Sequence, residues 1–210
     1  MKLTQRQSRV PIYAAILSGC AMFPIAAEAH LNATGMGPIY DGLMHFLMSP
    51  EDLVPVLALA LLSGLRGTTY GRRTLFVLPS AWLMGGLLGL AASASNGNAI
   101  ASAVWFLLLG GLLAADAKLS LPVTTALAAL LGIYHGYLNG TGLGLNFASA
   151  AALLGMIFSV FVLIALAAAF VVQLQASWAR IAVRVAGSWI FASGLLLMGW
   201  AVRSAQIGVL

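Results

Sequence analysis

The chain has 210 residues, of which 61% are hydrophobic and 7% are charged, and its mean hydropathy is +1.01. Soluble domains usually carry about 25% charged residues, so this composition excludes a soluble globular protein. The formal net charge is +5, but the Lys and Arg residues are scattered between apolar runs, which argues against nucleic-acid binding and favours a role in membrane topology.

The first segment is typical of a secretory signal peptide. Basic residues precede a short apolar stretch at 10–25, and residues 27–29 (AEA) place small side chains at the two positions that signal peptidase reads. We expect cleavage after Ala29, and the alternative is a retained first transmembrane helix. Cleavage would leave His30 as the first mature residue, where its α-amine and imidazole would either chelate a divalent metal together or be solvated without a role.

A short helical stretch at 40–48 follows a Gly-rich loop and carries Asp41 and His45 four residues apart. At this spacing both side chains lie on one helix face, so they can bind one cation, or the carboxylate can orient the imidazole. The alternative is a partly solvated helix turn at the membrane surface. Ionisable groups within membrane segments are usually functional, which favours a site.

The sequence Ser49-Pro50-Glu51-Asp52 predicts the start of a helix. The Ser side chain can cap the first turn, Pro is favoured at the first helical position, and two acids lie at the positive end of the helix dipole. Glu51 and Asp52 thereby have a sufficient structural role, and we do not expect either to be a metal ligand.

Six apolar spans follow, at about 53–65, 74–93, 99–115, 119–138, 147–172 and 181–202. The first is short for a bilayer, so we expect residues 40–48 to enter the membrane too, as a continuation across a kink at Pro50 or as a re-entrant piece. The sequence therefore predicts an all-α polytopic membrane helix bundle, with a signal peptide at 1–29 and a single transmembrane domain of about six helices at 30–210.

The basic residues predict the orientation of these helices. If the mature N-terminus is outside the cytoplasm, only Arg203 falls outside, and six basic residues fall on the cytoplasmic side, namely Arg66, Arg72, Arg73, Lys118, Arg180 and Arg184. This predicts a bacterial inner-membrane protein with a periplasmic N-terminus and all three histidines toward the outer face. Asp116 lies in a cytoplasmic connection, where we expect it only to be solvated.

A second polar group, YHGYLNG at 134–140, ends the fourth span. His135 and Asn139 are four residues apart and share a helix face. His135 is either part of a metal site or a buried structural histidine. The glycines at 132, 136 and 140 form a ridge that lets another helix pack closely, within the chain or between two copies.

These stretches together resemble the HupE/UreJ family, membrane proteins associated with nickel supply to hydrogenase and urease. The resemblance spans most of the mature chain, including GRRTLFVLPSAWLMGGLLGL in the second span and LPVTTALAALLGIYHGYLNG in the fourth. The first family motif, H-P-x-x-G-x-D-H, corresponds here to Gly37, Asp41 and His45, with three residues between the last two. The later motif, F-H-G-x-A-H-G-x-E, corresponds to His135, with Asn139 at its second His and no Glu.

The leading hypothesis is a permease that takes up Ni²⁺ or Co²⁺ from the periplasmic side. Its path would be lined by His30, Asp41, His45, His135 and Asn139, because a few imidazoles with one carboxylate bind an ion strongly enough to strip water and weakly enough to release it. The chain has no Walker A pattern, so we expect no ATP hydrolysis by it. No permanently bound cofactor is expected, since the metal is the transported substrate.

The alternative is a non-transporting accessory or scaffold protein for metalloenzyme assembly. The expected partners are the lipid bilayer and a divalent metal ion, with either a second copy of the chain or metalloenzyme maturation proteins. An enzyme is not expected. An intramembrane serine protease would need a base histidine packed on a serine, and Ser63 lies near the inner end of its span, away from the histidines.

Overall fold

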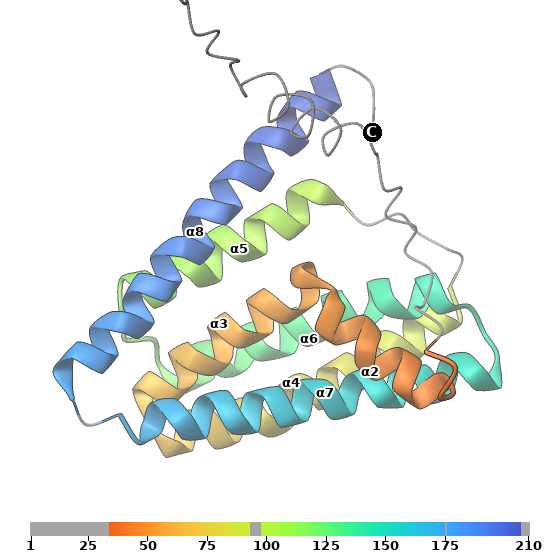
Figure 1. The fold of residues 1–210 in the computed structure, drawn as a ribbon, viewed down its shortest axis with the longest axis horizontal. Coiled ribbons are helices and arrows are strands. Elements are labelled where there is room, and N and C mark those ends of the chain that lie inside the picture. Colours follow the sequence, from red (N-terminus) through yellow and green to blue (C-terminus); the bar gives the residue numbers. More distant parts are fainter. Residues whose placement is uncertain (1–33, 93–97, 175, 207–210) are drawn as a thin grey trace, which may run out of the picture. The chain divides into compact units, whose positions relative to one another are not determined.

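A computed structural model describes residues 34–92, 98–174 and 176–206 of the chain. These residues form seven α-helices and no strand, which confirms the predicted all-α fold (Figure 1). The expected signal peptide and His30 lie outside the described residues. The helices are α2 (Pro38–Met48), α3 (Pro50–Arg66), α4 (Thr68–Leu90), α5 (Ala99–Ala114), α6 (Leu121–Leu143), α7 (Phe147–Val172) and α8 (Ser177–Gln206).

Each of the six expected spans corresponds to one helix from α3 to α8, but the helices differ in length. Among the described residues, α4, α6, α7 and α8 are each long and apolar enough to cross a membrane. α5 has 16 residues, whereas a transmembrane helix needs about 20. α2 and α3 meet the length and hydropathy requirement only together, as a pair bent by 73°. The predicted entry of residues 40–48 into the apolar region therefore agrees with the structure, as a broken span or a re-entrant piece.

The bend between α2 and α3 lies at Ser49, a single residue with extended backbone (φ −97°, ψ 94°). α3 begins at Pro50, as predicted, and the backbone N–H groups of Asp52 and Leu53 donate to the Ser49 carbonyl at 3.0 and 2.9 Å. The Ser49 side chain makes no capping hydrogen bond, so the expected side-chain cap is wrong. The backbone of Ser49 and the ring of Pro50 define the start of the helix.

α3 contacts all six of the other described helices. Its sequence from Leu53 to Leu62 is apolar all round, which is typical of a helix that is buried in a core or spans a membrane. Val56, Ala58, Leu59 and Ala60 accordingly have no exposed surface. Any polar residue on the inward face of α3 must therefore find its partners inside the bundle.

Glycine ridges bring α4 and α6 into backbone contact. Gly132, Gly136 and Gly140 of α6 lie against the α4 backbone, and a Cβ added to Gly136 would overlap the carbonyl oxygen of Trp82. On α4, a Cβ on Gly85 would likewise overlap the carbonyl oxygen of Ile133. The glycine ridge predicted from the sequence thus packs within the chain, and α4 and α6 run parallel as one tightly joined pair.

Most of the described basic residues gather at the end of α3 and the beginnings of α4 and α8, whereas Arg203 lies in the last turn of α8. Arg66 at the end of α3 is ion-paired with Asp116, and Arg180 lies 3.9 Å from the other oxygen of that carboxylate. Arg184 donates through Nε to the carbonyl of Ala114 at 3.1 Å. The sequence-based expectation that Asp116 is only solvated is therefore wrong. Asp116 connects its own loop to α3 and α8 at the basic end of the bundle.

The α4–α6 contact predicts that alanine substitution of two glycines of α6 will affect stability differently. Gly136→Ala should lower the apparent unfolding midpoint in detergent by about 5 °C, because overpacking a close contact costs about 1–3 kcal/mol. Gly142→Ala should leave the midpoint unchanged or raise it slightly, since a Cβ there meets nothing within 4 Å and Ala favours helix. Equal midpoints for the two variants would contradict the packing described here.

Candidate metal site

Four polar side chains from three helices meet at the end of the bundle opposite to the basic residues. They are His45 on α2, Asp52 on α3, and His135 and Asn139 on α6. Asp52 begins α3, whereas Arg66 ends it, so the helix separates the two groups of ionisable residues. A continuous set of hydrogen bonds joins all four side chains.

Asp52 and His135 form the buried centre of this set. The imidazole Nδ1 of His135 lies 2.7 Å from Oδ1 of Asp52, and the two residues are 2% and 4% exposed. An ionised carboxylate only accepts hydrogen bonds, so Nδ1 carries the proton of this contact. In the neutral imidazole this leaves the lone pair on Nε2, the arrangement by which a carboxylate prepares a histidine for metal binding.

Asn139 connects the buried pair to His45. Its amide nitrogen lies 3.2 and 3.1 Å from the two carboxylate oxygens of Asp52 and donates to the His135 carbonyl at 2.9 Å. These three acceptors fix the orientation of the amide group. Its oxygen consequently faces His45, whose Nε2 lies 3.1 Å away. The carbonyl oxygen of Asn139 and the imidazole nitrogen of His45 therefore lie side by side.

Aromatic rings enclose His135 on several sides. Trp82 of α4 stacks on the imidazole with ring centres 5.7 Å apart, and the rings of Trp105 and Tyr134 lie at 6.2 and 5.1 Å. Within the described residues, three buried polar atoms of this group have no hydrogen-bond partner, namely His135 Nε2, Trp82 Nε1 and the Tyr134 hydroxyl. Buried polar atoms without partners are costly and mark places where a ligand or an ordered water binds.

The structure brings together three of the five residues expected from the sequence: His45, His135 and Asn139. Asp41 is held elsewhere, because its Oδ1 accepts hydrogen bonds from the backbone N–H and hydroxyl of Thr34 at 2.6 and 2.7 Å. His30 lies outside the described residues. Within the described part of the chain, no three His, Cys, Asp or Glu side chains lie close enough to hold a metal ion in this conformation.

Asp52 is the residue of this set that the sequence analysis assigned to helix capping alone. Two signals in the sequence favour a larger role. Asp52 lies three and four residues before Pro55 and Val56, on the face of α3 that is buried. In addition, Glu51 and Asp52 follow His45 by six and seven residues, the spacing of the last two positions after the first His in H-P-x-x-G-x-D-H. In this register Asp52 takes the place of the second His.

The serine nucleophile of a protease is not found at this site. Ser63 donates to the carbonyl of Ala60 at 2.9 Å, and Ser193 donates to the carbonyl of Trp189 at 3.0 Å. Among the described residues none is hydrogen-bonded to Nε2 of His135, the nitrogen that a serine hydroxyl would need. The described residues therefore do not form the serine–histidine contact that such a protease needs.

Comparison with known proteins gives two matches. The family described as HupE / UreJ protein matches residues 18–197. A curated relative, Protein HupE of Rhizobium leguminosarum bv. viciae, is 26% identical over 121 residues, which make up 56% of this chain. The matched part spans 61% of the length of that relative. No solved structure matches the chain.

The buried pair predicts that Asp52 and its neighbour Glu51 differ sharply in their effect on stability. Asp52→Ala leaves His135 Nδ1 without its buried acceptor and leaves the Asn139 amide with only the His135 carbonyl, at a cost of about 1–3 kcal/mol for each unsatisfied N–H. The apparent unfolding midpoint should fall by several degrees. Glu51 is exposed, so Glu51→Ala should cost less than about 1 kcal/mol. The hydrogen-bond set would be refuted by equal midpoints for the two variants.

Proposed function

Because the chain belongs to the HupE/UreJ family, we propose that it is a membrane permease for a divalent transition-metal ion. One observation carries the proposal: a buried carboxylate–imidazole pair, Asp52 and His135, is linked through Asn139 to His45 in a bundle of membrane-length helices. Ionisable groups at such positions are costly, and in membrane proteins they usually mark the path of an ion.

The spacing of the donor atoms suits a metal ion. Two neighbouring ligands of an octahedral ion, each about 2.1 Å from it, lie about 3.0 Å apart. His45 Nε2 and Asn139 Oδ1 are 3.1 Å apart, so they can serve as adjacent ligands of an ion that lies beside the line between them, once the hydrogen of that contact has left. The Asp52 carboxylate supplies negative charge beside this edge.

Exchange between hydrogen bonds and metal ligation accounts for release of the ion. Without metal, each of the four side chains is bonded to another member of the set, while His135 Nε2 is left without a partner. Transport requires binding that is strong enough for entry and weak enough for departure. A site that regains its own hydrogen bonds when the ion leaves meets that requirement.

Nickel and cobalt are the ions that we propose as substrates, on the strength of the family resemblance. Asn139 stands where the later family motif has its second histidine, and an oxygen ligand holds borderline ions less tightly than imidazole does. We infer weaker and faster-exchanging ligation in this chain than in relatives with both histidines. The ion is transported substrate in this proposal, not a resident cofactor.

Uptake would proceed from the periplasmic side of a bacterial inner membrane. In this orientation the basic end of the bundle faces the cytoplasm, in accord with the positive-inside rule, and the His45 end faces the periplasm. Cleavage of residues 1–29 would place His30 at the mature N-terminus on the same side. His30 would then be an outer ligand that precedes the buried site.

The accessory role remains as the second candidate, and one observation favours it. The four polar side chains are hydrogen-bonded to one another, as the members of a purely structural set would be. In that case the chain would assemble with metalloenzyme maturation proteins and conduct no ion. Uptake measurements separate the two candidates.

Cells that express the chain should accumulate radioactive nickel or cobalt above vector controls. His45→Ala and His135→Ala should each reduce the gain about tenfold or more, the usual effect of removing a metal ligand or its supporting partner. Arg203→Gln is a matched control, because Arg203 is exposed on α8 and makes no part of the hydrogen-bond set. Protein levels in the membrane are measured in parallel. A wild-type chain that gives no gain for any divalent ion would establish the accessory role instead.

Processing of the N-terminus is tested separately. Purified protein from membranes should begin at His30 when sequenced from its N-terminus. Any other first residue would remove the terminal chelate from the proposal, while leaving the site on α2, α3 and α6 unaffected.

A further inference from the structure

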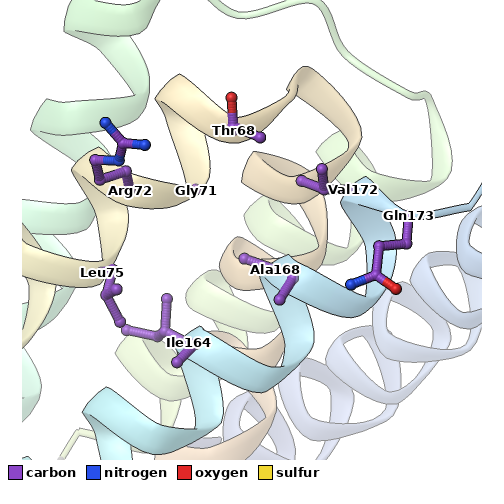
Figure 2. Close-up of a pocket in the computed structure, with 10 residues that line it drawn as sticks. Thr68, Gly71, Arg72, Leu75, Ile164, Ala168, Val172 and Gln173 are labelled. Carbon is purple, nitrogen blue, oxygen red and sulfur yellow. The ribbon is translucent and has the colours of Figure 1, made fainter.

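A groove lies between α4 and α7 at the basic end of the bundle, far along the helices from the candidate metal site. It has a volume of about 350 Å³, within the range of about 300–1,000 Å³ that is usual for ligand pockets. Figure 2 shows the residues that line it. They are Thr68, Gly71, Arg72, Leu75, Ile164, Ala165, Ala168, Ala169, Val172 and Gln173.

Small side chains create this groove. Gly71 of α4 faces Ala168 of α7, where an added Cβ would lie 3.2 Å from the alanine methyl group. Ala165, about one turn before Ala168, and Ala169, the residue after it, also line the groove. The flanking side chains are large and exposed, with Phe76 at 59% and Phe170 at 62%. In a membrane protein such exposed apolar side chains face lipid tails, so the groove opens toward the bilayer.

The polarity of the groove changes along its length. Leu75 and Ile164 lie together at one end, and Thr68 and Gln173 lie toward the other (Figure 2). Beyond the apolar end the rings of Phe76 and Phe161 are in contact, with centres 6.2 Å apart. The polar end coincides with the start of α4 and the end of α7. An apolar half directed into the membrane and a polar half at its surface match the two parts of a lipid.

The charge of the groove selects among lipids. Arg72 is exposed and lines the groove, while none of the ten lining residues is acidic. A guanidinium binds a phosphate through two parallel hydrogen bonds, and basic pockets between transmembrane helices bind anionic headgroups. We propose that this groove binds an anionic phospholipid, with an acyl chain along Leu75 and Ile164 and the headgroup phosphate on Arg72.

This lipid site does not depend on metal transport, since it shares no residue with the set around Asp52. It needs only that α4 and α7 cross the membrane, and both are long and apolar enough to do so. The acyl chain distinguishes a lipid from free phosphate, which would use Arg72 alone. The net negative headgroup distinguishes it from a zwitterionic lipid.

The test is native mass spectrometry of the full chain, purified in a mild detergent and supplied with phosphatidylglycerol or phosphatidylcholine. The wild-type protein should retain phosphatidylglycerol in preference to phosphatidylcholine. Arg72→Gln should lower that retention about fivefold, because a basic residue near the membrane surface contributes about 1 kcal/mol to anionic lipid binding. Ala169→Leu should fill the groove and lower retention of both lipids.

Arg73→Gln is the matched control, because Arg73 is the neighbouring exposed arginine of α4 and does not line the groove. It should retain phosphatidylglycerol as the wild type does. Three outcomes would overturn the proposal: equal retention of the two lipids by the wild type, an equal loss in Arg72→Gln and Arg73→Gln, or displacement of the lipid by inorganic phosphate. The last would assign Arg72 to a simple anion site.

Discussion

A carboxylate on the most enclosed helix constrains the arrangement of its neighbours. α3 touches every other described helix, and Asp52 lies on its buried face with 4% of its surface exposed. An unpaired charge in such surroundings costs several kcal/mol, so the neighbouring helices must supply donors. His135 and Asn139 do so from α6, and Asn139 in turn orients toward His45 on α2. One side chain thereby relates three helices in a fixed register.

The sequence predicts the helices well, because apolar length and glycine or proline boundaries are local properties. The positions of α3 to α8 follow from the six apolar runs, and the start of α3 follows from Pro50. The sequence predicts a kink at Pro50 between α2 and α3, but it does not predict the size of the bend, which is 73°. That size depends on which helices pack together, and packing is not encoded in any single run.

The candidate site is predicted in part, and the reason lies in the helical repeat. A four-residue spacing correctly places His135 and Asn139 on one face of α6, where both reach Asp52. The same spacing on α2 does not bring Asp41 into the site with His45, because the Asp41 carboxylate is hydrogen-bonded to Thr34 in the loop before the helix. The role of Asp52 in the site was not predicted from the sequence. Acidic residues are common at helix N-termini, so its position alone did not indicate that the side chain is buried.

The glycine contacts between α4 and α6 have a mechanical consequence. Backbone lies directly against backbone along this pair, so neither helix can slide or rotate without the other. His135, Asn139 and the stacked ring of Trp82 are all carried on this pair. Asp52 and His45 are carried on α3 and α2, which are joined through the single extended residue Ser49. α2 is itself packed backbone to backbone on α7, where a Cβ on Gly42 would overlap the carbonyl oxygen of Ala152. The site is therefore assembled from two separately packed parts of the bundle, α4 with α6 and α2 with α3, and Ser49 is the connection within the second part.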